Sequence, residues 1–143
     1  MTQEQIIAAT RRVIEEGFGE GRLSVLDEVM APGFVEHQAG ISPATVEGVK
    51  RAITALHTAF PDMKVKTEEI VTSGDKAWAR STGRGTHGGP FMGMPPSGRP
   101  FTITVMDVCR FENGKMVEHW GVTDQLALMV QIGALPVPLQ GKP

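Results

Sequence analysis

The chain has 143 residues, of which 41% are hydrophobic and 21% charged, and its formal net charge is −2. This length suffices for one domain with a core, and the weak negative charge gives no basis for binding nucleic acid or a membrane surface. The N-terminus lacks a signal-peptide pattern, no apolar run is long enough to span a membrane, and Cys109 stands alone. We therefore expect one cytoplasmic domain over residues 1–143, with a proline-rich tail at 134–143.

Helices are predicted in the first part of the chain. Thr2 and Gln5 form a capping box, and apolar residues recur at helical spacing as far as Ile14. A short second helix is expected from about Leu23 to Met30. A third helix carries an apolar stripe, and Pro61 ends it; the stripe consists of Val49, Ile53, Leu56 and Phe60.

The second part of the chain is predicted to form strands. Residues 63–71 and 76–86 form two of them, and a long hairpin over 101–123 turns at Asn113-Gly114. Asp124 can cap a short helix that follows, and Phe34 to His37 form a short extended segment before the third helix. Helices followed by a strand meander indicate an α+β fold with a curved antiparallel sheet. Helices packed across its concave side would enclose a pocket.

The register of the hairpin decides which acid–base side chains share a face. A two-residue turn at Asn113-Gly114 places Asp107 opposite Trp120, whereas a bulged turn places Asp107 opposite His119. The residues alone leave both registers open. In the bulged register, Asp107 and His119 lie on one largely apolar face, together with Ile103, Val105, Cys109, Gly121 and Thr123. Such a face is typical of a small-molecule site.

Asp107 is the sharpest candidate, because its named neighbours on that face carry no charge and burial would then disfavour its ionised form. His37 and His119 also lie in extended segments beside apolar residues. None of the four histidines has metal-ligand spacing, so we expect no metal. Gly83 to Gly88 match the glycine pattern of dinucleotide sites, but the prolines at 90, 95 and 96 forbid the helix that such a site needs. This loop could instead cover the pocket, with Met92 as an apolar contact.

Several motifs resemble the SnoaL-like polyketide cyclase, or ester cyclase, family over nearly the whole chain. They are Phe60-Pro61-Asp62, Gly85-Thr86-His87-Gly88, the run from Phe91 to Arg99, Arg110-Phe111, Glu118-His119-Trp120, Asp124 and Gln131-Ile132-Gly133. The resemblance implies the cone-shaped α+β barrel shared with nuclear transport factor 2 and ketosteroid isomerase. It also implies an intramolecular aldol cyclisation by a carboxylate acid–base without metal or organic cofactor, and association through the sheet.

The resemblance also places site residues. The catalytic Asp of the cyclases corresponds to Gly121 here, and a pocket His of the cyclases corresponds to Asp107. These correspondences favour the bulged register. We therefore predict a cofactor-independent cyclase or isomerase acting on an apolar carbonyl compound. Asp107, His37 and His119 are its predicted catalytic residues, and Val105, Gly121, Thr123, Asp124 and Met92 its predicted substrate contacts.

Two other functions remain open from the sequence. Asp107 and His119 could activate a water molecule for hydrolysis of an epoxide or lactone. Because Gly121 cannot move a proton, the pocket could also bind a small ligand, or the domain could serve dimerisation, without catalysis. In each case the apolar sheet face away from the pocket, which includes Met106 and Val122, predicts a homodimer or a higher homo-oligomer.

Overall fold

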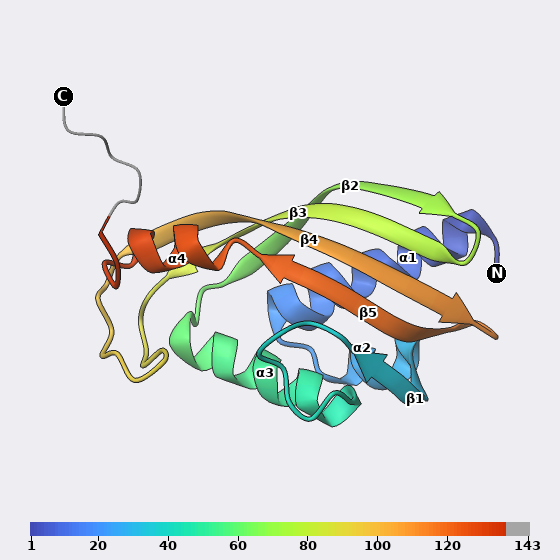
Figure 1. Cartoon of the computed structure of the whole chain (residues 1–143), viewed down its shortest axis with the longest axis horizontal. Coiled ribbons are helices and arrows are strands. Elements are labelled where there is room, and N and C mark those ends of the chain that lie inside the picture. The colour runs from blue at the N-terminus through green and yellow to red at the C-terminus, as the bar shows by residue number, and fades with distance from the viewer. Residues whose placement is uncertain (137–143) are drawn as a thin grey trace.

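A curved, open five-stranded sheet forms the centre of the structure, and α1, α2 and α3 lie across one of its faces (Figure 1). The structure, a computed structural model, describes residues 1–136. In chain order its elements are α1 (Gln3–Arg11), the π-helical segment η1 (Arg12–Phe18), α2 (Ser24–Val29), β1 (Met30–Glu36), α3 (Val46–Ala59), β2 (Lys64–Ser73), β3 (Lys76–Thr86), β4 (Pro100–Glu112), β5 (Lys115–Thr123) and α4 (Gln125–Gln131). Most of the predicted tail, residues 137–143, lies outside the described part. The predicted α+β architecture is confirmed.

Local side-chain chemistry explains where the helices begin and end. The capping box at the start of α1 forms as expected, since the Thr2 side chain accepts from Gln5 N–H and the Gln5 side chain accepts from Thr2 N–H. Thr45 caps α3, and that helix stops at Ala59, before Pro61. No helix in the described part of the chain is long and apolar enough to cross a membrane.

The strands pair in the order β1-β5-β4-β3-β2, and β2 to β5 are antiparallel, as predicted. At one edge, however, β1 runs parallel to β5, so the prediction of a wholly antiparallel sheet is wrong there. The physical reason is the long connection from β1 through α3 and three strands, which lets β5 return in the direction of β1. This parallel pair sets Glu36 beside His119 as a Cα partner.

Two apolar clusters fill the space between the helices and the sheet. One cluster joins α1, α2 and α3 to the sheet through fully buried side chains such as Leu26, Ile53 and Met116. The second cluster lies toward α4 and includes Phe60, Phe101 and Ile132. The rings of Phe60 and Phe101 meet edge to face, with centroids 4.8 Å apart. The polar side chains of the candidate site project from the same sheet face that these clusters cover.

The β4–β5 hairpin uses a register that neither predicted alternative described. Asn113 and Gly114, at φ 50° and 80°, form a two-residue turn between the paired Glu112 and Lys115. A bulge further along the strands then shifts the pairing, so that Asp107 lies opposite Gly121 rather than Trp120 or His119. Because this pairing differs from the bulged alternative by two residues, the same side chains share a face. Asp107, His119 and Gly121 therefore lie together, as the bulged register predicted.

Candidate active site

A buried imidazole between two buried carboxylates forms the chemical centre of the candidate site. His119 Nε2 lies 2.7 Å from Asp107 Oδ1, and His119 Nδ1 lies 2.7 Å and 2.9 Å from the two carboxylate oxygens of Glu36. All three residues are less than 10% exposed. Each ring nitrogen therefore faces a carboxylate at the distance of a charge-assisted hydrogen bond.

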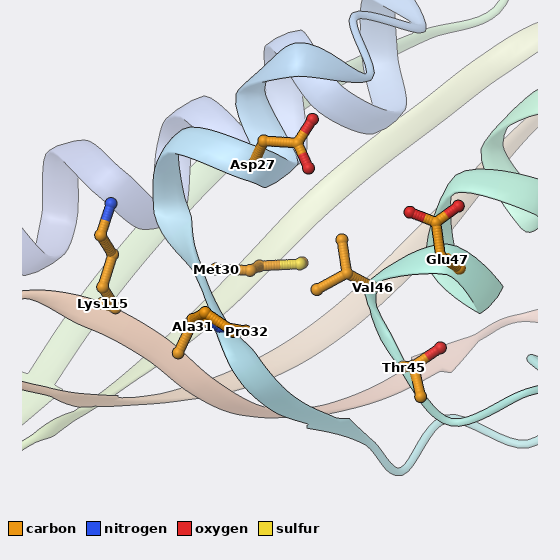
Figure 2. A pocket seen from close by; sticks show the side chains of 8 residues that line it. All are labelled: Asp27, Met30, Ala31, Pro32, Thr45, Val46, Glu47 and Lys115. Carbon is orange, nitrogen blue, oxygen red and sulfur yellow. The ribbon is translucent and has the colours of Figure 1, made fainter.

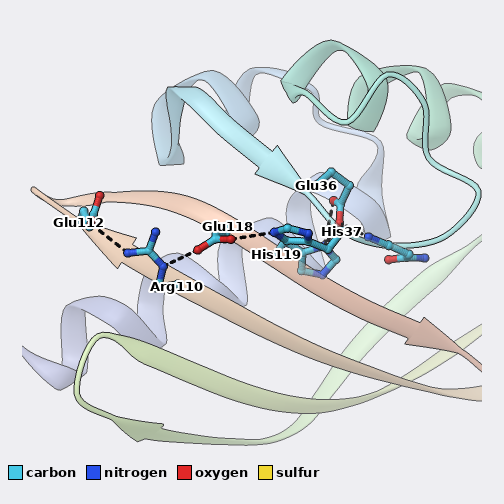
Figure 3. Close-up of polar contacts among 7 residues, drawn as sticks. Glu36, His37, Arg110, Glu112, Glu118 and His119 are labelled. Atoms are coloured by element: carbon cyan, nitrogen blue, oxygen red, sulfur yellow. Dashed lines mark hydrogen bonds and ion pairs between the residues drawn. The ribbon is translucent and has the colours of Figure 1, made fainter.

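Three strands supply these side chains, one from each. Asp107 projects from β4, His119 from β5 and Glu36 from the last position of β1. Figure 3 shows Glu36 reaching from β1 toward His119. The backbone holds this arrangement, because His37 N–H donates to His119 C=O over 2.9 Å and Gln38 N–H donates to Glu36 Oε1 over 2.9 Å. The triad Glu36–His119–Asp107 is thus built on paired strands, which position side chains more rigidly than loops do.

The two carboxylates keep His119 protonated. Burial alone would lower the pKa of an imidazole, but the hydrogen bonds and charges of Asp107 and Glu36 outweigh burial and raise the pKa of His119 to about 9. At neutral pH both ring nitrogens therefore carry hydrogen and donate. His119 lies on the same face as Asp107, as predicted, and supplies a positive charge 2.7 Å from its carboxylate.

The raised pKa of His119 predicts a specific loss of stability at alkaline pH. Its folded-state pKa of about 9 lies above the ordinary 6.5, so its stabilising contribution is complete below about pH 6.5 and is lost as pH rises through 9. The shift corresponds to about 3 kcal/mol. We expect the difference in unfolding free energy between the wild-type protein and His119→Gln to shrink by about this amount from pH 6 to pH 10. Denaturant titrations at both pH values measure it, and an unchanged difference would contradict the assignment.

Gly121 leaves room for this cluster. A Cβ atom added at Gly121 would overlap Oε1 of Gln38 and would lie 2.8 Å from His119 Cε1 and 3.0 Å from Asp107 Oδ1. These are distances that real Cβ atoms do not tolerate, so any larger residue at 121 would displace the ion pair or Gln38. The space in front of Gly121 is therefore filled by neighbouring side chains.

The predicted orientation of His37 toward the pocket is wrong. Its side chain lies on the opposite face of the sheet, where it stacks on Trp120 with ring centroids 4.7 Å apart. Its Nε2 lies 2.7 Å from Glu118, which also accepts from Arg110 over 2.6 Å (Figure 3). The reason is the parallel pairing of β1 with β5, which directs Glu36 toward the concave face and leaves the next residue facing away. Glu36 takes the place that the sequence assigned to His37.

The structure separates the predicted substrate contacts into two groups. Val105, Gly121 and Thr123 lie on the Asp107 face of β4 and β5 and are partly buried. Asp124 caps α4, as predicted, by accepting from Ala127 N–H over 3.0 Å. Met92 is 69% exposed at the tip of its loop, and its sulfur contacts Gln125 rather than the Asp107 face. The predicted role of Met92, as an apolar contact on a loop that covers the pocket, stays a prediction.

Cys109 is a core residue, as expected. It is 1% exposed, and burial together with the charges of Asp107 and Glu36 raises the pKa of its thiol well above the ordinary range. The glycines at 83 and 85 belong to β3, and the next element is β4, so the helix that a dinucleotide motif needs does not follow them. Among residues 1–136, no group of three or more His, Cys, Asp or Glu side chains has an arrangement that could hold a metal ion.

A surface hollow of about 470 Å³ lies apart from this chemistry (Figure 2). Its walls come from the end of α2, β1, the start of α3 and β5, and are formed by Asp27, Met30, Ala31, Pro32, Thr45, Val46, Glu47 and Lys115. The two carboxylates in the wall already pair with Lys50, at 2.9 Å and 3.4 Å. Both carboxylates share this one ammonium partner, and none of the triad residues lines the hollow.

Comparison with known proteins supplies the family context. The family model described as SnoaL-like polyketide cyclase matches residues 8–132. The chain is 31% identical over 108 residues to the aklanonic acid methyl ester cyclase DnrD of Streptomyces peucetius, covering 74% of this chain and 72% of that protein. It is 29% identical over 134 residues to the enzyme of the same description, DauD, of Streptomyces sp. strain C5, covering 89% and 81%.

Solved structures give the same picture of the fold. TsrD from Streptomyces laurentii superposes with a TM-score of 0.85 at 29% identity, covering 94% of this chain and 99% of that one. IdmH from Streptomyces antibioticus, described as a candidate polyketide cyclase, superposes with a TM-score of 0.79 at 35% identity, covering 90% and 99%. The similarity thus extends over the whole sheet that carries the triad.

Proposed function

Because the chain belongs to the SnoaL-like polyketide cyclase family, we propose that it closes a ring in an apolar polyketide by an intramolecular aldol reaction, without a cofactor. The observation that carries this proposal is the triad, in which a carboxylate on the covered sheet face is held beside a charged imidazole. Asp107 is the proton-transfer group. Its Oδ1 accepts from His119, which leaves Oδ2 for a substrate.

The proposed reaction conserves all atoms of the substrate. Asp107 accepts the proton from a carbon next to a carbonyl group, and the electron pair of that C–H bond forms an enolate. The enolate carbon attacks a second carbonyl of the same molecule, and the new alkoxide takes the proton back from Asp107. General acid–base transfer of this kind contributes about 10²–10⁴-fold to the rate. His119, held by Glu36, donates to Asp107 Oδ1 and fixes the orientation of that carboxylate.

His119 itself is a positioning residue in this scheme. Both of its N–H groups are already engaged, one with Glu36 and one with Asp107. In its charged form it has no free lone pair, so it can neither act as a base nor ligate a metal. It acts on the reaction only through Asp107, whose carboxylate it orients. Its own orientation is fixed by Glu36, which accepts from the other ring nitrogen.

Aklanonic acid methyl ester, named in the two curated relatives, is the first substrate to test. Incubation of the purified protein with this ester should give a cyclised product of unchanged mass. Chromatography with mass detection monitors the conversion. Hydrolysis of a lactone or epoxide by the same base would instead add the mass of one water molecule. If the ester is recovered unchanged even when protein and ester are present at equal concentrations, the protein is not a cyclase for this ester.

The outer face of the sheet supports the further proposal of a homodimer. On four neighbouring strands, Val71 pairs with Trp78 and Met106 pairs with Val122, and these side chains are 60%, 39%, 50% and 71% exposed. A contiguous apolar surface of this kind marks a contact site, and a two-fold pairing of sheets would cover it in both copies. We expect light scattering at micromolar concentration to give twice the 15.4 kDa chain mass, and Met106→Glu to give the chain mass. A wild-type value of one chain would contradict the dimer.

A further inference from the structure

The proposed aldol reaction requires a hydrogen-bond donor at the carbonyl oxygen as well as a base at the neighbouring carbon. When Asp107 removes the proton, negative charge develops on that oxygen, and a positioned donor stabilises it. His119 has no N–H to spare, because one ring nitrogen donates to Glu36 and the other to Asp107. Asp107 is an acceptor, and the Glu36 side chain is fully buried. The donor must therefore come from outside the triad.

Gln38 lies at the right place for this task. Its Oε1 lies so close to the point at which a side chain of Gly121 would begin that the two would overlap, and that point is also bordered by His119 Cε1 and Asp107 Oδ1. Gln38 is partly exposed, so its amide can meet a ligand that reaches Asp107. A half-turn of the terminal torsion exchanges the oxygen and the NH₂ group, so the donor end can face the same point.

The backbone around Gln38 is fixed, although its side chain is not. Its N–H donates to Glu36 Oε1 over 2.9 Å, and its C=O accepts from Ile41 N–H over 3.3 Å. His37 N–H, one residue earlier, is bonded to His119 C=O. These contacts involve only the backbone of Gln38. Its side-chain amide has no hydrogen-bond partner within residues 1–136. A rigidly anchored residue with an unengaged amide beside a reactive carboxylate has the properties of a substrate-binding group.

We propose, on the basis of the cyclase function above, that the side-chain amide of Gln38 donates a hydrogen bond to the carbonyl oxygen of the substrate while Asp107 takes the proton from the adjacent carbon. Gly121 makes this possible, since any side chain there would expel the Gln38 amide. The charge on the enolate oxygen is thus stabilised by a neutral N–H donor, and the carbon-bound proton passes to Asp107. After ring closure the proton returns to the new alkoxide, so the amide is unchanged at the end.

Turnover of aklanonic acid methyl ester by Gln38→Leu, which removes the amide at similar size, tests this role. We expect kcat to fall about 10²-fold with a much smaller change in KM, because the developing charge and not the ground-state carbonyl needs the donor most. The matched control is Gln3→Leu, which changes an exposed glutamine of α1 and should keep wild-type rates. Equal kcat in Gln38→Leu and the wild-type protein would overturn the proposal.

A binding measurement decides the role of Gln38 even if the wild-type protein leaves that ester unchanged. The probe is 1,8-dihydroxyanthraquinone, an apolar polycyclic carbonyl compound, added to ¹⁵N-labelled protein. We expect the side-chain NH₂ signals of Gln38, assigned by their loss in Gln38→Leu, to shift on binding, and the Kd to rise about tenfold in that variant. Unmoved Gln38 signals, or the same Kd in both proteins, would overturn the role of Gln38. Failure of turnover with a positive binding result would count against the cyclase assignment alone.

Discussion

Replacing Asp107 with Asn should lower kcat by about 10²–10⁴-fold, the usual contribution of a general acid–base group, with little change in KM. Asn keeps the size of Asp and can still accept from His119 Nε2 through its carbonyl oxygen, so the shape of the site is preserved. It cannot take up a proton from carbon. Initial rates of cyclisation, measured with a protein that circular dichroism shows to be folded at the assay temperature, give the result.

The matched control for Asp107→Asn is Asp27→Asn on α2. The Asp27 side chain is 62% exposed and pairs with Lys50, and it belongs to α2 rather than to the three strands that carry the triad. An exposed pair of this kind contributes at most about 1 kcal/mol to stability, so this variant should retain the wild-type rate. If Asp107→Asn also kept the wild-type kcat, Asp107 would not be the proton-transfer group.

Removal of Glu36 should produce the largest loss of stability. Glu36→Ala leaves the charged His119 ring with one carboxylate instead of two and deprives Gln38 N–H of its acceptor. Breaking a buried ion pair by deleting one partner costs about 3–5 kcal/mol. We expect a decrease of this size in the unfolding free energy at pH 7, obtained from denaturant titration.

Glu118→Ala is the appropriate comparison for Glu36→Ala. Glu118 lies in β5 next to His119 but on the other face, where it pairs with Arg110 and His37 and its side chain is 23% exposed. Its removal should cost much less than removal of Glu36, because its charge and its partners lie at the solvated face of the sheet. Equal losses in the two variants would show that Glu36 and His119 are not coupled as a buried pair. Reversal of the loss in a variant that replaces Glu36, His119 and Asp107 together by Leu would support the coupling, because no unpaired charge of the triad is then left.

The sequence predicted those parts of the fold that depend on local chemistry. The capping box at Thr2, the end of α3 before Pro61 and the Asn113-Gly114 turn are set by residues within a few positions of each other, and all are confirmed. The common face of Asp107 and His119 depended on the hairpin register, which the residues alone left open and which the family resemblance decided. The exact partner of Asp107 was not predictable, since a bulge beyond the turn shifts the pairing.

The prediction for β1 failed because its partner is far away in the chain. Glu36 and His37 alternate along one strand, and either could have faced the pocket until the pairing of β1 with β5 was known. The same long-range pairing brings Gln38 to Gly121, and no sequence motif marks that contact. The sequence did contain one signal for the ion pair, namely the two Glu-His dipeptides at 36–37 and 118–119. The carboxylate of Glu36 in the first dipeptide pairs with the imidazole of His119 in the second.

The most direct test of the proposed site is a measurement of the protonation state of His119, because the triad depends on a charged ring between Glu36 and Asp107. In a protein labelled with ¹⁵N-histidine, both ring nitrogens of His119 should show directly bonded hydrogen at pH 7 and titrate near pH 9. His119→Gln assigns the signals by their absence. A neutral His119 ring at pH 7 with an ordinary titration near pH 6.5 would contradict the charged bridge between Glu36 and Asp107.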